Sequence, residues 1–512
     1  YDTGDRLTSI EYPNGYGFTF SYDAAGRLTK RTALDGMAEC YAYDAAGRLS
    51  TVTDDAGTLY VSNAYDATTG RMSGQTYGNG SSTAYAYDLC GRIVSIVHKD
   101  AAGAVSENLS YRYDADGRCV RATSLLGEER YTYDDDGQLT SVTYPSGDSE
   151  TFAYDAVGNR TSAKGATYTA NSLNQYTTVK TASRTDRLTY DADGNLMSRT
   201  GASGTTTYAY DQQNRLVAVS NPAQNLDWSC TYDALGNRVS VTTNGVTTTR
   251  IMLPGSLPSV AAEYRNGSLV KRHIVVGAAQ VAEIDAKGAS RYYHGDLIGS
   301  ARLVTDAAGT TTGRLSYKAF GEGRSRTGEA ASAGYVGLLG VETDPTGLLF
   351  MRNRYYDPSL GRFIQRDPIG LSGGDVNWYR YCGNAPIIKC DVDGLFVETE
   401  IINTPAVSFT YKGRTYSIGA RSTVMRIDYS FRNTKSDGGW NPGFVGYDIQ
   451  LRRPLQMAWK RKSLSPFWDY RSGNYMEKLK RHETMHYLLY TEGVLGMGSE
   501  DEFVSEVMAR LA

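Results

Sequence analysis

The sequence predicts a mostly β protein, in which a long repetitive sheet is followed by a small α+β domain. A unit of the form Tyr-Asp-x-x-Gly-Arg/Asn-Leu recurs from the first residue to about Ser240. The composition is rich in Gly (55) and Tyr (40) and poor in Pro (13), which is typical of many short strands joined by tight turns. The unit disappears after Leu395, and the last part of the 512-residue chain has helix spacing instead.

Each repeat unit is interpreted as two strands joined by an Asp-x-x-Gly turn. The unit begins at Tyr22, Tyr43, Tyr65, Tyr87, Tyr113, Tyr133, Tyr154, Tyr190, Tyr210 and Tyr232. The Tyr65 unit has one extra residue before its Gly, and the Tyr210 unit has no Gly. Tyr at every second position, as in Tyr41 and Tyr43, places the rings on one face of a strand. A period of mostly 20 to 22 residues predicts units that bury their apolar faces by stacking on neighbours.

Composition and charge exclude several classes of protein. The formal net charge of −3 gives no electrostatic reason to expect nucleic acid as a partner. The six cysteines are scattered singly, so a disulfide scaffold is not expected. No stretch is long and apolar enough to span a membrane, and no signal peptide is visible. Because the chain starts inside a repeat at Tyr1-Asp2 without Met, we expect a fragment that lacks its true N-terminus.

Two Asp-led turns flank an aromatic alternation near the end of the repetitive part. They are Asp367-Pro368-Ile369-Gly370 and Asp391-Val392-Asp393-Gly394, and they begin 24 positions apart. One interpretation is a pair of structural Asx turns on either side of a strand. The other is a pair of carboxyls that come together, share a proton and activate a water on a peptide bond.

The region from Tyr292 to Leu395 resembles the C-terminal end of the core region of Rhs (YD-repeat) proteins, the family that includes the C components of Tc toxins. The resemblance rests on the sequences at 292–300, 304–306, 320–322 and 354–363 and on the two Asp clusters. It implies a hollow β-shell around a payload, and an aspartyl self-cleaving protease that cuts after the closing Gly-Leu.

Carried over to this chain, the resemblance makes Asp367 and Asp391 the carboxyl pair, Arg366 a supporting charge and Leu395–Phe396 the bond that is cut. The family usually has Asp-Pro at the second cluster, where this chain has Asp391-Val392. Asp393 is a further available carboxyl, so the sequence leaves open which of the two acts.

Three domains are expected: a YD-repeat shell over 1–250, an Rhs core-associated region with the protease over 251–395, and a toxin domain over 396–512. In the middle region, residues 269–276 and 280–284 have strand patterns. His273 and His294 are isolated there, and we expect both to be hydrogen-bonded structural residues.

The last domain has strand patterns at 406–411, 415–418, 424–429 and 445–449 and a helix from about Asn474. That helix contains His482-Glu483-Thr484-Met485-His486, an HExxH motif. Two His residues at i and i+4 lie on one helical face and can bind one Zn²⁺, while Glu483 can polarise a metal-bound water. The alternative is a surface helix that carries two His residues without a metal.

A second helix begins at Ser499 with a capping box, and its acidic residues could complete a zinc site. The helical end, about 474–511, resembles gluzincin-like metallopeptidases, and Glu502 is the expected third ligand. Glu506 would then orient His482, or the two Glu residues could exchange these roles. Glu502 could instead only cap its helix.

We therefore interpret the sequence as the C-terminal part of a bacterial Rhs toxin, whose shell holds a zinc metallopeptidase freed by its own aspartyl cut. The expected partners are a protein substrate in a target cell, an immunity protein and a secretion-system delivery partner, with no nucleic acid. The protein would be secreted or on the cell surface, and its toxin domain would be delivered into a target cell. Two alternatives stay open: a cell-surface adhesion or carbohydrate-binding protein, and a toxin whose last domain has another activity.

Overall fold

The structure is a computed structural model that describes residues 1–395 apart from 13–14, 256 and 330–331, together with the backbone of four strands beyond 395. The chain divides into two compact units, Tyr1–Ile402 and Asn403–Ala512, and each is considered by itself. In the described part of the chain, no helix has the length and apolar character needed to cross a membrane. The fold prediction of a mostly β chain is confirmed for these residues.

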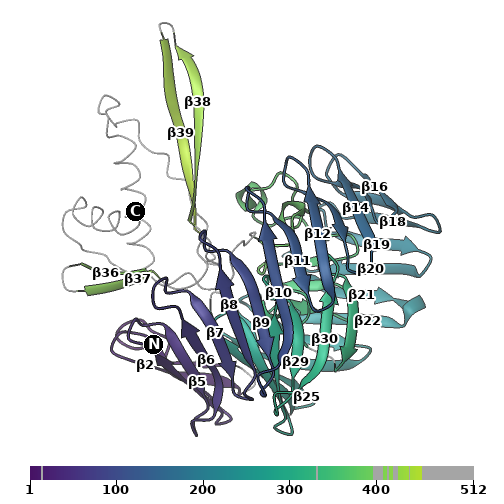
Figure 1. The fold of residues 1–512 in the computed structure, drawn as a ribbon. Helices are drawn as coiled ribbons and strands as arrows, with labels where there is room; N and C mark the ends of the chain where they lie inside the picture. The colour runs from purple at the N-terminus through teal and green to yellow at the C-terminus, as the bar shows by residue number, and fades with distance from the viewer. Residues whose placement is uncertain are drawn as a thin grey trace. The chain divides into compact units, whose positions relative to one another are not determined.

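Thirty-one strands of the first unit form one antiparallel sheet in which every strand pairs with the next along the chain (Figure 1). The first sixteen are β1 Ser9–Glu11, β2 Gly17–Tyr22, β3 Leu28–Ala33, β4 Ala38–Tyr43, β5 Leu49–Thr53, β6 Leu59–Tyr65, β7 Met72–Tyr77, β8 Ser82–Tyr87, β9 Ile93–Lys99, β10 Val105–Tyr113, β11 Cys119–Ser124, β12 Gly127–Tyr133, β13 Leu139–Thr143, β14 Ser149–Tyr154, β15 Arg160–Ala163 and β16 Ala166–Ala170. The others are β17 Tyr176–Lys180, β18 Thr185–Tyr190, β19 Leu196–Gly201, β20 Gly204–Tyr210, β21 Leu216–Asn221, β22 Leu226–Tyr232, β23 Arg238–Thr243, β24 Val246–Leu253, β25 Ser259–Arg265, β26 Ser268–Val276, β27 Ala279–Asp285, β28 Ser290–Gly295, β29 Ala301–Thr305, β30 Thr311–Tyr317 and β31 Gly323–Gly328.

The repeat unit is a hairpin closed by its own Asp. In the Tyr43 unit, Oδ1 of Asp44 accepts hydrogen bonds from the backbone N–H groups of Ala46 (3.0 Å) and Arg48 (2.8 Å). Oδ2 accepts a third from Nε of Arg48 at 2.7 Å. Gly47 has φ +79°, a conformation that costs glycine little. The pattern Asp-x-x-Gly-Arg therefore follows from the hydrogen bonds of one tight turn.

Two departures from the repeat pattern have a simple structural explanation. In the Tyr210 unit, Asn214 takes the left-handed position with φ +61°, and Asn is one of the few other residues that adopts it readily. The same substitution occurs in the long interval after Tyr154, where Asn171 closes a turn and Asn174 has φ +61°. The sequence interpretation missed this last hairpin because neither Asp nor Gly marks it.

Neighbouring hairpins are joined by contacts of the Tyr and Arg residues that recur in the repeat units. The hydroxyl of Tyr43 donates to the carbonyl of Leu28 in the preceding hairpin at 2.9 Å. The guanidinium of Arg27 lies 4.6 Å from the centre of the Tyr43 ring. The Tyr–carbonyl bond recurs at Tyr22, Tyr65, Tyr87, Tyr113, Tyr133, Tyr154, Tyr210 and Tyr232.

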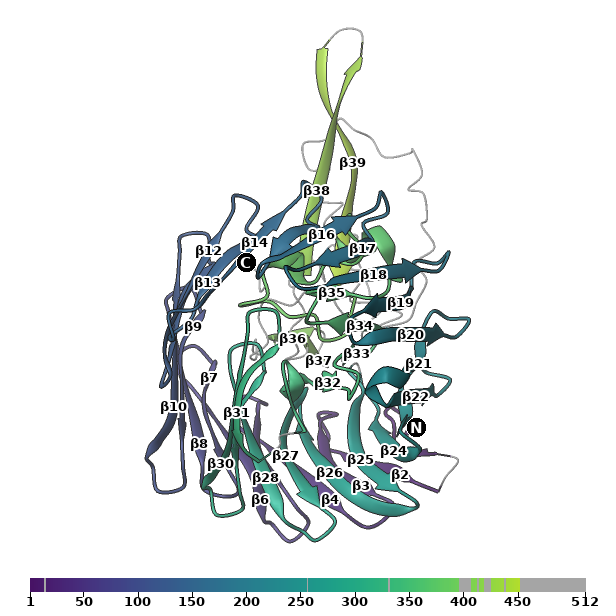
Figure 2. The ribbon, with the colours of Figure 1, turned by 90° about the vertical axis from the view of Figure 1, so that its right-hand side faces the viewer.

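The sheet curls so that its first strands face its later ones (Figure 2). Phe18 on β2 packs with Ile251 on β24 and Tyr264 on β25. Val61 on β6 packs with Ile274 on β26 in a second buried cluster. Both predicted strands of the middle region are confirmed as β26 and β27, and the sheet continues through residue 250, which lies inside β24.

A buried polar cluster joins the two facing layers at His98 on β9 and His294 on β28. The two imidazole rings lie edge to face with their centres 5.3 Å apart. Thr83 contacts Nδ1 of His98 at 2.9 Å, and Nε2 of His98 lies 2.9 Å from the carbonyl of Gly295. His294 Nε2 lies 3.1 Å from the hydroxyl of Thr305. His294 is thus a hydrogen-bonded structural residue, and His273 likewise contacts Glu263 at 3.3 Å.

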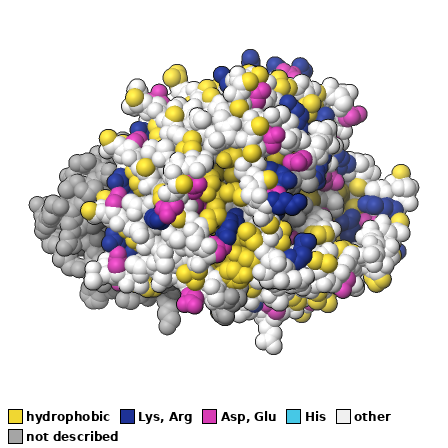
Figure 3. Space-filling view, turned by 90° about the horizontal axis from the view of Figure 1, so that it is seen from below, with side chains coloured by type: hydrophobic (Ala, Val, Ile, Leu, Met, Phe, Trp, Pro, Cys, Tyr) yellow, Lys and Arg dark blue, Asp and Glu magenta, His cyan; other side chains and the backbone are white. Residues whose placement is uncertain are grey.

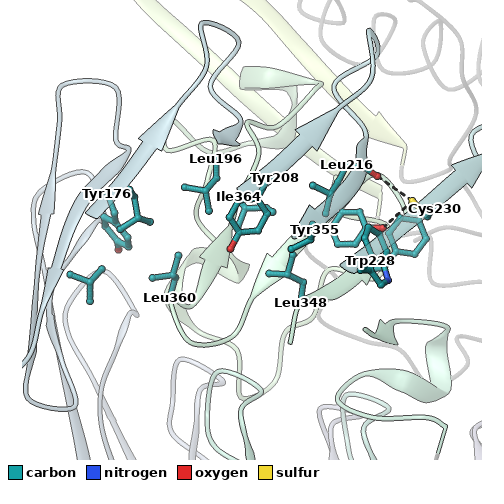
Figure 4. Close-up of a cluster of buried hydrophobic side chains, with 14 of the residues drawn as sticks. Tyr176, Leu196, Tyr208, Leu216, Trp228, Cys230, Leu348, Tyr355, Leu360 and Ile364 are labelled. Carbon is teal, nitrogen blue, oxygen red and sulfur yellow. Dashed lines mark hydrogen bonds between the residues drawn. The ribbon is translucent and has the colours of Figure 1, made fainter. Parts of the chain in front are cut away.

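A second, four-stranded sheet lies against the concave side of the 31-stranded sheet, which is called the wall from here on (Figure 2). Its strands are β32 Glu342–Thr343, β33 Leu349–Met351, β34 Arg354–Asp357 and β35 Arg362–Phe363. Tyr355 on β34 packs with Trp228 and Cys230 of the wall in a cluster that Figure 4 shows. Four short 3-10 helices complete the unit: η1 Pro222–Gln224, η2 Gly337–Leu339, η3 Gly370–Gly373 and η4 Cys382–Asn384.

The second unit contains two hairpins, β36 Val407–Tyr411 with β37 Arg414–Ile418 and β38 Met425–Ser436 with β39 Gly439–Leu451. The strand patterns predicted at 406–411, 415–418, 424–429 and 445–449 overlap these strands, while residues 406 and 424 lie outside the described part of the chain. On the face of the molecule in Figure 3, hydrophobic side chains gather in a band across the middle, and side chains of both charge signs are interspersed around it.

Candidate active site

The first Asp turn, at residues 367–370, follows the four-stranded sheet and is fixed by two backbone hydrogen bonds. The N–H of Asp367 donates to the carbonyl of Trp378 at 3.0 Å, and the N–H of Gly370 donates to the carbonyl of Asp367 at 3.0 Å. Oδ1 of Asp367 accepts the N–H of Ile369 at 3.0 Å, which leaves Oδ2 directed elsewhere. The Asx turn expected from the sequence is therefore present, and it orients the carboxyl.

The second Asp turn is anchored to the β33–β34 turn. The N–H and the side-chain amide of Asn353 both donate to the carbonyl of Asp393, at 3.1 and 2.8 Å. Gly394 has φ +72°, and a Cβ there would lie 2.5 Å from the carbonyl oxygen of Met351. The segment can approach β33 this closely only because Gly394 has no side chain.

Arg354 joins the two Asp turns. This residue belongs to β34, and its Nη2 lies 3.3 Å from Oδ2 of Asp367 and 3.2 Å from Oδ2 of Asp391. Its Nη1 donates to the carbonyl of Trp378 at 3.0 Å, and its Nε donates to the carbonyl of Gly394. With 3% of its surface exposed, Arg354 is a buried cation that two carboxyls share.

The chain segment that ends at Leu395 runs through this pair. The N–H of Leu395 donates to Oδ1 of Asp391 at 3.1 Å and to Oδ1 of Asp393 at 2.9 Å. A Cβ placed on Gly373 would lie 2.6 Å from Oδ2 of Asp367 and 3.4 Å from the carbonyl oxygen of Leu395. That carbonyl and the Asp367 carboxyl therefore face the same small space, which a residue larger than glycine at 373 would fill.

Burial determines the protonation of the two carboxyls. It raises the pKa of Asp391 well above the usual range, the Asp393 carboxyl raises it further, and Arg354 acts in the opposite direction. Burial also raises the pKa of Asp367, against the effect of the Arg354 cation. The Asp393 carboxyl raises the pKa of both acids, so the carboxyls around Arg354 influence one another's charge.

The residues 87–387 match the family described as Teneurin YD-shell, and residues 1–36 match the RHS repeat. The first match spans more than half of the chain. The chain belongs to the teneurin YD-shell family. The Rhs resemblance expected from the sequence is confirmed for the YD-shell part of the protein.

Two curated relatives of this YD-shell protein carry different activities in their names. It is 32% identical to double-stranded DNA deaminase toxin A of Burkholderia cenocepacia, over 56% of this chain and 22% of the relative. It is 28% identical to the tRNA3(Ser)-specific nuclease WapA of Bacillus spizizenii, over 51% of this chain and 11% of the relative. The chain thus spans less than a quarter of either relative's length.

A solved structure shows the same fold. The crystal structure of TcdB2-TccC3 matches with a TM-score of 0.59 and 22% identity, covering 74% of this chain and 22% of the other. At this level of identity the match concerns the YD-shell fold alone.

The YD-shell brings together three of the residues predicted from the sequence, Asp367, Asp391 and Leu395. Arg366 lies on Trp378, with its guanidinium 4.2 Å from the ring centre. The arginine between the carboxyls is Arg354, which the sequence interpretation did not assign to the site. The available signal was an Arg at the start of a short strand followed by two Tyr residues, because a buried cation requires anionic partners.

The remaining predicted site residues lie outside the described part of the chain: Phe396, His482, Glu483, His486, Glu502 and Glu506. Within the described residues, no group of three or more His, Cys, Asp or Glu side chains is arranged to hold a metal ion.

Proposed function

We propose that the chain is part of an Rhs-type toxin that cuts its own peptide bond after Leu395 and so separates the domain that follows from the YD-shell. One observation carries the proposal. Arg354 holds Asp367 and Asp391 together against the backbone of Leu395, inside the shell, where both carboxyls have raised pKa values.

The proposed reaction is hydrolysis by a carboxyl pair. The ionised member of the pair removes a proton from a water, whose oxygen bonds to the carbonyl carbon of Leu395. The protonated member donates to the carbonyl oxygen. The C–N bond to Phe396 then breaks, and the leaving amine takes up the proton that came from the water. The geometry favours this assignment because the Leu395 carbonyl faces Asp367 while its N–H is held by Asp391.

Replacing Asp367 tests the self-cleavage. The wild-type chain should give two bands on a denaturing gel, and sequencing of the smaller fragment should begin at Phe396. Asp367→Asn should give one full-length band. Asp375→Asn is the matched control, because the Asp375 carboxyl pairs with Arg380, at 2.6 Å. Two bands from Asp367→Asn would refute the proposal.

We further propose that the released domain is a zinc metallopeptidase, on the support of the HExxH motif and the acidic second helix. Zn²⁺ would be held by His482, His486 and Glu502, with Glu506 as the alternative ligand, and would acidify a bound water. Glu483 would accept the proton of that water and pass it to the amine of a protein substrate. Delivery by a secretion system into a target cell and an immunity protein in the producer belong to the same proposal.

Glu483→Gln in the full chain tests the peptidase. Toxicity should be lost while bound zinc, measured by elemental analysis, stays at one ion per chain. His486→Ala should lose both. Toxicity that survives Glu483→Gln would remove the peptidase assignment and leave the self-cleavage proposal untouched.

An effector that acts on nucleic acid is the second candidate, because both relatives named above carry such activities in their names. Those two relatives match a similar share of this chain but differ from each other in activity, so the shared part does not determine the effector. Degradation of target-cell DNA or RNA that persists in Glu483→Gln would favour this candidate.

A further inference from the structure

Asp393 is a third carboxyl at the candidate cleavage site, and it contacts the same amide as Asp391. Both Oδ1 atoms accept the N–H of Leu395, at 2.9 Å from Asp393 and 3.1 Å from Asp391. Asp393 is 6% exposed and Asp391 1% exposed. Two acceptors therefore converge on one donor in a place that water scarcely reaches.

Two ionised carboxylates cannot occupy this place without a large electrostatic cost. Like charges in a buried site shift a proton onto one of the pair. Burial raises the pKa of Asp391, and the Asp393 carboxyl raises it further through its charge and its side-chain hydrogen bond, which favours the protonated form of Asp391. Asp393 is thus positioned to influence both the charge of the Asp367–Asp391 pair and the position of the Leu395 amide.

The groups that face Asp391 come from four parts of the shell. Arg354 approaches from β34, Asp367 from the first Asp turn and Asp393 from the same turn as Asp391 itself. The thiol of Cys382, from η4, is the fourth; burial raises its pKa, and the Asp391 carboxyl raises it further. Among these groups Asp393 alone touches both Asp391 and the residue whose carbonyl is attacked.

We propose that Asp393 is a positioning residue for self-cleavage, which fixes the Leu395 amide and keeps the proton of the carboxyl pair in place as the pH rises. The proposal rests on the self-cleavage proposed above. An ionised carboxylate at Asp393 opposes loss of that proton, and its Oδ1 holds the Leu395 amide beside Asp391. Asp393 itself exchanges no proton with the substrate.

Cleavage during cell-free synthesis, sampled over time in buffers of different pH, tests the inference. Asp393→Asn keeps an acceptor for Leu395 but removes the charge, so the fall in rate on the alkaline side should move down by about one pH unit. Asp393→Ala removes both and should also slow cleavage at every pH by about tenfold or more. Asp393→Glu should keep the wild-type pH profile.

Asp375→Asn is the matched charge control. Asp375 also raises the pKa of Asp367, but the pH profile should stay within a few tenths of a unit of the wild type because Asp375 does not hold Leu395. A profile for Asp393→Asn that coincides with that of Asp375→Asn would overturn the inference. If Asp393→Asn does not cleave at any pH, the resistance of its shell to an added protease shows whether the variant is folded. A protease-resistant shell without cleavage supports the positioning role of Asp393.

If that shell is protease-sensitive, the pH profile of cleavage by Asp393→Glu is used instead. A shifted profile overturns the positioning role, and an unshifted profile supports it.

The two proposals fail in different ways. Cleavage by Asp367→Asn would overturn the self-cleavage itself. Loss of cleavage in Asp367→Asn together with an unshifted Asp393→Asn profile would overturn only the role of Asp393.

Discussion

The YD-shell uses the same two residue types, Asp and Arg, in its repeat hairpins and in its candidate site, with opposite electrostatic results. Asp23 in a repeat turn lies at the surface, and the pKa of its carboxyl is lowered by the backbone N–H of Arg27 and then by the Arg27 side chain. Asp391 also contacts an arginine, Arg354, at 3.2 Å against 2.7 Å for Asp23 and Arg27, yet burial raises its pKa. The difference is access to water, because desolvation penalises the charged form of an acid whatever its partner is.

This contrast explains why one pair is structural and the other is suited to chemistry. The Asp23 carboxyl is ionised and fully used by its own turn, so it has no proton to give. Asp391 and Asp367 share one cation between two acids; Asp391 accepts the N–H of Leu395, and Asp367 borders the same space beside Gly373 as the Leu395 carbonyl. A protonated acid beside an ionised one is what hydrolysis by a carboxyl pair requires.

Removing the buried cation should have the largest effect. Arg354→Met leaves two buried carboxyls without their counter-charge, so we expect self-cleavage to slow by at least about a hundredfold. The measurement is the fraction of cleaved chain after cell-free synthesis.

Arg366→Met is the control for Arg354→Met, because the Arg366 guanidinium stacks on Trp378 and is exposed. It should cleave at close to the wild-type rate. An equal loss of cleavage rate in both variants would show that Arg366, which precedes Asp367 in sequence, supports the reaction as the sequence interpretation expected. It would also show that the contacts of Arg354 with the two carboxyls do not set the cleavage rate.

The two regions also differ in how far the sequence predicts them. The hairpins could be predicted in detail, since Asp-x-x-Gly-Arg specifies its own turn through local hydrogen bonds. The Asn171 hairpin was missed because Asn replaces both markers. At the site, Asp367 and Asp391 could be predicted from turn chemistry and resemblance. Arg354 could not, because its distance from Asp391 depends on how the wall curls around the small sheet, and no local pattern encodes that.

A buried base in the wall should respond to acid in the opposite sense to the buried acids of the site. Burial lowers the pKa of His98 to about 4, against the hydrogen bond to Gly295, and Arg302 lowers it further. Because the pKa of His98 in the folded protein lies below the unfolded value, its contribution to the free energy of unfolding is fully present above about pH 6.5. That contribution is lost as the pH falls toward 4, and the loss should reach about 3 kcal/mol.

The urea midpoint of the shell at pH 7 and pH 5 measures this loss. His98→Gln should be less stable than the wild type at pH 7, because it disturbs the contacts with Thr83 and Gly295. It should also lose less stability than the wild type between the two pH values. An equal acid loss in both proteins would mean that His98 is not the group responsible, and the same comparison on His294, whose pKa burial also lowers, would follow.

The smallest effect is expected in a single repeat. Tyr43→Phe removes the hydroxyl that donates to the Leu28 carbonyl but keeps the ring under Arg27, so stability should fall by about 1 kcal/mol. Arg27→Met removes the stacking cation and the partner of Asp23 instead, and should also lower stability, because both contacts of the guanidinium are lost. Neither variant should change the rate of self-cleavage, because the contacts of Tyr43 and Arg27 that are removed lie between neighbouring hairpins of the wall. A cleavage defect in Tyr43→Phe would mean that the wall transmits strain to the carboxyl pair, and the separation between a structural and a chemical use of Asp and Arg would no longer hold.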